Sequence, residues 1–217
     1  MITIYTGTPG AGKTSHALCA VRDCAWSGKR VLTNFPCNAP KWPRRSGFSL
    51  DFVEWDALTP SLVCEWLEGV TGEGRALLVI DEAQLVFNSR DWNAAGRREW
   101  IAFFTQHRKL GCDVILIAQD SNMLDKQIRA LCEVERRHRR LSSFGLIGWA
   151  LSLGGQLMAY SDYHPATRFH LGGGLWWLSP QVRRMYDTCH LMAGSLGASS
   201  PSRHATPERG AAARVGA

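Results

Sequence analysis

A glycine-rich stretch near the amino terminus carries the residue types that bind the phosphate groups of a nucleotide. It fits the pattern G-x-x-x-x-G-K-[ST] without a mismatch. Glycines let successive backbone N–H groups turn toward phosphate oxygens, and the amino end of a following helix adds partial positive charge. We expect the nucleotide-binding residues here to be Gly7, Thr8, Pro9, Gly10, Ala11, Gly12, Lys13 and Thr14. Lys13 would lie near the β and γ phosphates as a mobile cation, and the Thr14 hydroxyl would be a ligand of Mg²⁺.

An acidic pair at the end of an apolar run supplies the second half of such a site. Residues 77–80 are all apolar and lead directly into Asp81 and Glu82. This pattern is typical of a buried parallel strand, which we expect to lie beside the strand that precedes the glycine-rich loop. Asp81 would then hold the Mg²⁺ shell, and Glu82 would polarise a water molecule for attack on the γ phosphate. Together the two motifs predict a site that binds and hydrolyses a nucleotide.

Two further side chains are candidates for catalytic roles. Gln119 follows the apolar run 114–118 and would hydrogen-bond the γ phosphate or the water, unless it only caps the strand. Arg108 precedes that strand and could complete a neighbouring subunit's site as an arginine finger. A solvated helix end is an equally good interpretation of Arg108, and Arg97 and Arg98 are rivals for the finger.

The elements that must position these residues alternate between strand and helix. Apolar, β-branched runs predict strands, and amphipathic spacing between glycine and proline signals predicts helices. We expect strands at 2–5, 30–33, 76–80 and 114–118, helices at 13–26, 60–68, 96–110 and 124–133, and a proline-rich loop at 36–47. Gly28 and Gly111 would end the helices that precede them. This order predicts an α/β fold with a mostly parallel sheet flanked by helices.

Composition limits the partners and the compartment. The net charge of +6, from 25 Lys and Arg against 19 Asp and Glu, favours phosphates, nucleic acid or membrane surfaces as partners. The 7 cysteines are scattered without metal-binding spacing, which indicates free thiols in a reducing compartment. No signal peptide precedes the first strand, so we expect the bulk of the chain to face the cytoplasm. We expect residues 1–190 to form one domain and residues 191–217 a flexible polar tail.

One uncharged segment tests this interpretation. Residues 141–160 carry no charge and follow the basic run 136–140, as a membrane span with a positive inner flank would. Four glycines, three serines and Gln156 oppose insertion, so a buried hairpin or loop is favoured over a span or an interfacial segment. The basic run itself reads first as a solvated strand or helix end and only secondarily as a phosphate-binding patch.

Several motifs together resemble one known family. They are Met1–Thr14, Thr33-Asn34, Val79–Gln84, Gln106-His107-Arg108, Gly111–Val114, Ala118-Gln119 and Tyr186-Asp187-Thr188. The combination, which spans residues 1–188, is similar to the zonular occludens toxin family. That family includes the inner-membrane assembly ATPase encoded by gene I of filamentous phages.

The resemblance implies a RecA-like P-loop NTPase, here with a β-rich extension toward the carboxyl end. Lys13 and Thr14 correspond to the family's ATP and Mg²⁺ residues, and Asp81 and Glu82 to its Walker B pair. It also implies a ring-shaped homo-oligomer such as a hexamer on the cytoplasmic side of the bacterial inner membrane. Its partners there would be phage single-stranded DNA with its packaging or coat proteins, and inner-membrane assembly and export proteins. Family members commonly continue into a transmembrane helix and a periplasmic part, whereas here Leu191 leads into a polar tail.

Other functions share parts of this pattern. The motif Asp81-Glu82-Ala83-Gln84 also occurs in thymidine kinases, but the cysteine-rich zinc site usual there has no counterpart here. Some helicases carry it too, but a second motor domain would not fit in 217 residues. An interaction module or toxin that keeps the pocket for structure alone would have no chemical need for all four of Lys13, Thr14, Asp81 and Glu82.

Overall fold

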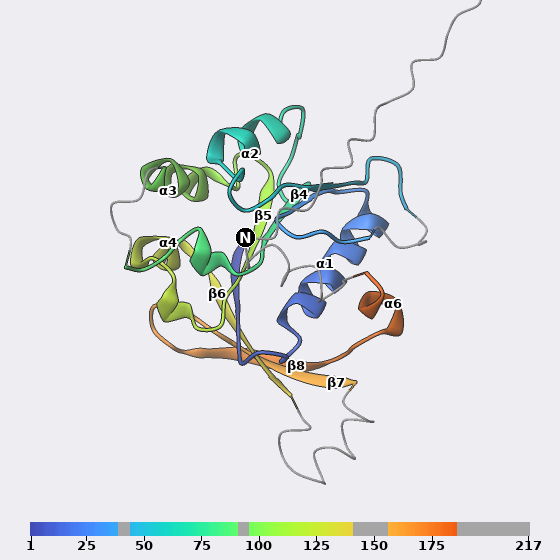
Figure 1. Ribbon diagram of the computed structural model, residues 1–217, viewed down its shortest axis with the longest axis vertical. Coiled ribbons are helices and arrows are strands. Elements are labelled where there is room, and N and C mark those ends of the chain that lie inside the picture. Colours follow the sequence, from blue (N-terminus) through green and yellow to red (C-terminus); the bar gives the residue numbers. More distant parts are fainter. Residues whose placement is uncertain (39–43, 91–95, 141–155, 186–217) are drawn as a thin grey trace, which may run out of the picture. The chain divides into compact units, whose positions relative to one another are not determined.

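Across residues 1–38, 44–90, 96–140 and 156–185, which the computed structural model describes, eight strands form one sheet (Figure 1). The strand order is β3-β2-β4-β5-β1-β6-β7-β8. The bounds are β1 (Ile2–Thr6), β2 (Arg30–Thr33), β3 (Ser49–Phe52), β4 (Ala76–Ile80), β5 (Cys112–Ile117), β6 (Val134–Arg140), β7 (Leu157–Tyr163) and β8 (His170–Trp177). From β3 to β6 neighbouring strands are parallel, and β7 and β8 extend the sheet in antiparallel fashion.

Helices cover both faces of the parallel part, as its apolar strands require. Every residue of β1 and β4 is buried. The helices are α1 (Lys13–Ser27), α2 (Pro60–Trp66), α3 (Arg97–Gln106), α4 (Lys126–Leu131) and α6 (Pro180–Arg183), with short 3-10 turns η1 (Ala83–Leu85) and η2 (Ser121–Met123). In Figure 1, α1 and α6 lie on one side of the strands, and α2, α3 and α4 lie on the other. Separate hydrophobic clusters fill the two layers.

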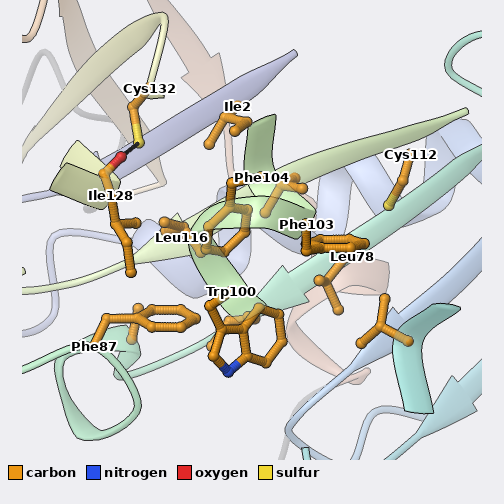
Figure 2. Close-up of a cluster of buried hydrophobic side chains, with 14 of the residues drawn as sticks. Ile2, Leu78, Phe87, Trp100, Phe103, Phe104, Cys112, Leu116, Ile128 and Cys132 are labelled. Carbon is orange, nitrogen blue, oxygen red and sulfur yellow. Dashed lines mark hydrogen bonds between the residues drawn. The ribbon is translucent and has the colours of Figure 1, made fainter. Parts of the chain in front are cut away.

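The larger cluster fixes the strands that end at the candidate site. Figure 2 shows the rings of Trp100, Phe103 and Phe104 from α3 gathered with Phe87 against the sheet. Neighbouring rings lie 5.1 to 5.7 Å apart between centroids, in edge-to-face and stacked arrangements. Burying each such ring stabilises the fold by about 1.5–3 kcal/mol. Because this layer also packs on Leu78 of β4, it holds the strand that leads into Asp81.

The parallel core confirms most of the elements expected from sequence. The first strand, the helix at 13–26 and the strands at 30–33 and 76–80 lie where their patterns predicted them. Gly28 ends α1 with a left-handed backbone, φ 69°. The six cysteines of the described residues are free thiols, as expected, and Cys189 lies outside that part of the chain.

Some boundaries differ from expectation for local reasons. Strand β3 was not predicted, because its half-exposed residues show no apolar run at the sheet's edge. Helix α4 begins later than expected because the Asp125 carboxylate accepts hydrogen bonds from the Gln127 and Ile128 N–H groups and caps it. Helix α3 ends at Gln106 rather than Leu110, and Gly111, at φ 70°, ends the turn that follows.

The expectation that the strand before Asp81 lies beside the strand before the glycine-rich loop was wrong. Strand β5 lies between β4 and β1 and pairs with both. This central position is available to β5 because nearly all of its side chains are apolar and buried. The carboxyl ends of parallel strands still share one edge of the sheet, so Asp81 can approach the loop across β5.

The basic run belongs to β6, an internal strand between β1 and β7, so it is a strand as the first interpretation held. It is less solvated than expected, since His138 in it is buried. With β7 and β8 it forms the β-rich extension. Residues 141–155 of the uncharged segment lie outside the described part of the chain. No helix among the described residues has the length and hydropathy needed to cross a bilayer.

Candidate nucleotide site

The loop between β1 and α1 has a backbone that requires its glycines. Gly7, Gly10 and Gly12 have φ values of 140°, 73° and 85°, which side chains rarely allow. The Gly7 N–H donates to the Gln119 carbonyl at 3.2 Å, which joins the loop to the end of β5. The motif therefore lies between a strand and a helix, as expected, at the carboxyl edge of the sheet.

The extension packs tightly against these glycines. A Cβ atom on Gly7 would lie 2.5 Å from the His138 carbonyl oxygen of β6, and one on Gly12 would lie 3.0 Å from the Trp176 ring of β8. Above Gly10 lies the Arg140 guanidinium, which donates to the Gly10 carbonyl. The shape of the loop is therefore set by β6 and β8 as well as by its own sequence.

Lys13 folds back over its own loop. Its Nζ donates to the carbonyl of Gly7 at 2.8 Å and to that of Thr8 at 3.3 Å. Partial burial lowers the pKa of Lys13, and the carboxylates of Asp81 and Glu82 partly offset this. The ammonium group thus lies inside the loop, where phosphate oxygens would be better acceptors than backbone carbonyls.

Thr14 and Asp81, 67 residues apart in sequence, meet at this edge. The Thr14 hydroxyl donates to Asp81 Oδ2 at 2.8 Å. Burial raises the pKa of the Asp81 carboxyl, while the Thr14 hydroxyl and the Glu82 N–H lower it. A divalent cation beside the pair would favour the ionised carboxylate, and a hydroxyl with a carboxylate is an oxygen donor set that suits Mg²⁺.

The side chain of Asn34 holds the backbone of Asp81 through two hydrogen bonds. Its Nδ2 donates to the Asp81 carbonyl at 2.9 Å, and its Oδ1 accepts from the Asp81 N–H at 2.6 Å. Sequence reasoning noted Thr33-Asn34 only as part of a resemblance. The sequence signal that could have identified Asn34 was its position directly after β2, a strand that pairs in parallel with β4.

Glu82 has a strained backbone. Its φ of 48° lies in the left-handed region, which is uncommon for residues with a side chain. Its carboxylate accepts a hydrogen bond from the Gln84 amide. Such outliers cluster at functional sites, where surrounding structure holds them. Lys13, Thr14, Asp81 and Glu82 are thus brought together.

Gln119 and Arg108 lie at different ends of the sheet. The exposed Gln119 shares a cleft with Gly7, Thr8 and Pro9. Arg108, 61% exposed, donates to Glu133 Oε2 at 2.7 Å, and the other oxygen of Glu133 accepts from the Ile2 N–H. That is the amino edge of the sheet, so Arg108 does not reach Gly7–Thr14 of its own chain. Its role in a neighbouring subunit stays a prediction.

A buried histidine pair behind the loop was missed from sequence. His138 Nδ1 lies 3.2 Å from the Thr6 carbonyl, so this nitrogen must carry the proton. His138 Nε2 then accepts from His16 Nδ1 at 2.8 Å. Burial lowers the pKa of His16 to about 3 and that of His138 to about 4, so both rings are neutral at neutral pH. The pair ties α1, β1 and β6 together around the loop.

Comparison with known proteins places this geometry in a family. A family model described as zonular occludens toxin (Zot) matches residues 1–186. The Gene 1 protein of Enterobacteria phage I2-2 is 34% identical over 185 residues, which cover 79% of this chain and 48% of that protein. The chain thus spans about half the length of the curated relatives it matches.

Solved structures share the fold. The N-terminal domain of zonular occludens toxin from Neisseria meningitidis is 20% identical, with a TM-score of 0.57 over 86% of this chain and 98% of that one. The genome packaging NTPase B204 from Sulfolobus turreted icosahedral virus 2, in complex with AMP, is 11% identical, with a TM-score of 0.50 over 80% of this chain and 96% of that one. The fold is that of a P-loop NTPase, with a mostly parallel sheet flanked by helices.

Proposed function

The chain belongs to the zonular occludens toxin family, and from this premise we propose that it binds ATP with Mg²⁺ and hydrolyses it to drive filamentous phage assembly. The observation that carries the proposal is the 2.8 Å contact between Thr14 and Asp81 beside Lys13. It joins two motifs that a nucleotide site needs and that lie far apart in sequence. We propose that residues 1–190 form the NTPase domain. This extent is supported by the compact unit that residues 1–187 form.

Each residue has a role that follows from its position. The loop N–H groups and Lys13 Nζ bind phosphate oxygens, and Thr14 and Asp81 hold the Mg²⁺, which when bound neutralises phosphate charge. The Glu82 carboxylate orients the attacking water and accepts its proton. Gln119 reaches the same edge from β5 and donates from its amide to the γ phosphate or to the water.

The proposal extends to the role in the phage. Relatives named as phage Gene 1 proteins support it, and so does a P-loop fold shared with a genome packaging NTPase. We propose that the chain acts at the cytoplasmic face of the host's inner membrane, as a homo-oligomer in which Arg108 completes a neighbour's site. Its partners would be phage single-stranded DNA with its packaging or coat proteins, and the membrane proteins of assembly and export.

Nucleotide binding is tested with Lys13→Ala. We expect this variant to lose measurable binding of a fluorescent ATP analogue in the presence of Mg²⁺, because Lys13 supplies the cation inside the loop. Lys126→Ala, which removes an exposed lysine from α4, is the matched control and should bind as the unaltered chain does. Equal affinity in all three proteins would refute the site.

The role in the phage is tested in infected cells. A host producing a filamentous phage that depends on this chain should release virions with the unaltered chain and none with Lys13→Ala. Normal virion release with a variant that has lost ATP binding would separate nucleotide binding from assembly and refute this part of the proposal.

A further inference from the structure

The extension has one face turned to the nucleotide loop and one turned away. Directly opposed residues of antiparallel strands lie on the same face. One row, Arg140, Met158 and Trp176, lies on the face of α1. Alternate residues must therefore lie on the opposite face, and they form the rows Arg139, Ala159, Leu175 and Arg137, Ser161, Gly173. We call this opposite face of β6, β7 and β8 the outer face.

Large apolar side chains are exposed at the β8 end of the outer face. Leu175 is 60% exposed and Trp177 is 45% exposed, and Phe169, just before the strand, is 69% exposed. No described strand pairs with the far edge of β8. Soluble proteins seldom expose several large apolar residues together unless the surface binds something.

Arginines line a cleft at the β6 end of the extension, with Arg137 and Arg139 on the outer face and Arg140 on the face of α1. This cleft of about 670 Å³ runs between β6 and η2 and is lined by Arg137, Arg139, Arg140 and Arg168 together with Gly7, Thr8 and Pro9. The buried Glu135 holds two of these arginines, Arg137 at 2.9 Å and Arg168 at 3.2 Å. The single carboxylate of Glu135 can neutralise only one of the four arginine charges. The cleft is therefore net positive despite the exposed Asp120 at its rim.

The backbone supports this placement of arginine. Arg168 has a φ of 57°, a left-handed conformation that a non-glycine residue adopts only when other contacts hold it. From that turn its guanidinium reaches Glu135 on β6, while Arg137 lies over the Tyr163 ring at 4.5 Å. One guanidinium group of the outer face thus lies against an aromatic ring.

We propose that the outer face and the arginine cleft bind single-stranded nucleic acid. Phosphates would lie along Arg137, Arg139 and Arg168, and unpaired bases would stack on Trp177 and Phe169. A duplex keeps its bases inside and cannot offer them to exposed rings, so a single strand fits this face. The net positive charge favours a polyanion over an apolar peptide or a second copy of this basic chain. The inference builds on the proposed function by giving its nucleic-acid partner a location. The cleft borders the nucleotide loop at Gly7, Thr8 and Pro9, but Arg139 and Trp177, which the test changes, are not residues of the nucleotide site.

Binding of a labelled oligothymidylate to the full chain, followed by fluorescence anisotropy, tests this. Trp177→Ala should weaken binding by about tenfold or more, since one stacked base is lost. Arg139→Gln should weaken it too, and should reduce the slope of log affinity against log salt by about 0.7, the value for one phosphate contact on a single strand. Trp55→Ala and Arg90→Gln, which alter exposed residues elsewhere, are matched controls and should bind normally.

The outcomes separate this inference from the proposed function. Lys13→Ala should lose ATP binding and keep oligonucleotide binding. Thermal unfolding of Trp177→Ala should match that of the unaltered chain, which excludes misfolding as the cause. The inference is overturned if the oligonucleotide does not bind, or if Trp177→Ala leaves its affinity unchanged. It is equally overturned if Trp177→Ala only shifts the protein's sedimentation toward a smaller species, because the face would then join copies of the chain.

Discussion

At the scale of single residues, Glu82 combines a costly backbone with a chemical role. A left-handed conformation costs a residue with a Cβ about 1–3 kcal/mol. The neighbouring contact between its N–H and Asp81 Oδ1, at 2.8 Å, is made in that conformation. Strain of this kind persists where the surrounding structure holds it, and it is found most often at functional sites.

Replacing Glu82 by Gln should separate chemistry from binding. The amide keeps the shape but cannot accept a proton, so we expect hydrolysis to fall by about 10²- to 10⁴-fold while ATP affinity changes little. Phosphate release under single-turnover conditions, together with analogue binding, measures both. Glu73→Gln, an exposed change remote in sequence, is the control. A rate equal to that of the unaltered chain would exclude Glu82 as the base.

The residues of the site were largely predictable, and their supports were not. Lys13, Thr14, Asp81 and Glu82 stand in motifs with fixed spacing, so the sequence alone pointed to them. Asn34, His16 and His138 act through contacts between separate elements, and no spacing in the chain encodes those contacts. The fold class followed from apolar runs, whereas the strand order did not, because β4 and β5 carry similar apolar runs.

At the scale of elements, the glycine loop depends on its packing against β6. Gly7 and Gly69 both have positive φ values, 140° and 78°, but no atom lies within 4 Å of a Cβ on Gly69. On Gly7 such an atom would meet the His138 backbone, which cannot turn aside as a flexible side chain can.

Alanine at these two glycines should therefore have different effects. Gly69→Ala should cost about 1–2 kcal/mol from backbone strain alone. Gly7→Ala should cost more and also weaken ATP binding, because the loop must move away from β6. Chemical denaturation and analogue binding give the two readouts. Equal losses of stability, with ATP affinity retained in both, would show that β6 does not shape the loop.

The histidine pair makes the packing between the glycine loop and β6 sensitive to acid. Both folded-state pKa values, about 3 and about 4, lie below the ordinary histidine value of about 6.5. Below pH 6.5 the unfolded chain therefore binds more protons than the folded one. The stability due to this difference is complete above pH 6.5 and is lost as the pH falls through about 4 for His138 and about 3 for His16.

His138→Asn should reduce this dependence. An asparagine can still donate to the Thr6 carbonyl, because its amide nitrogen takes the place of Nδ1, but it does not titrate. Each histidine contributes a slope of about 1.4 kcal/mol per pH unit to the free energy of unfolding. With one histidine of the pair left, the free energy of unfolding of the variant should fall by about 1.4 kcal/mol between pH 6 and pH 5, about half the fall in the unaltered chain. Denaturation midpoints across this range measure it. An unchanged slope would mean that His138 is not buried in its neutral form.

At the scale of the whole molecule, Arg108 and the nucleotide loop lie at opposite edges of the sheet. An arginine on the amino edge can serve a nucleotide site only if another copy presents that edge to it. Head-to-tail contacts of this kind generate rings or filaments. The position of Arg108 thus ties the question of catalysis to that of assembly.

Mixing two inactive variants tests this arrangement. Arg108→Ala keeps its own loop, and Lys13→Ala keeps its arginine. In an equal mixture, about one quarter of the sites would have an intact loop next to an intact arginine, so that share of hydrolysis should return. Full activity of Arg108→Ala alone, or no recovery on mixing, would remove Arg108 from the mechanism.

The contacts of β7 and β8 with α1 also determine how short a functional fragment of the chain can be. Trp176 stacks on His16 at 4.7 Å, and Tyr160 lies 5.3 Å from the same ring. A chain cut after the last parallel strand would keep Lys13, Thr14, Asp81 and Glu82, yet it would expose the histidine pair and leave Gly12 without its contact to Trp176. Any shortened version meant for biochemistry must therefore extend past Leu178, because β7 and β8 form one wall of the nucleotide pocket.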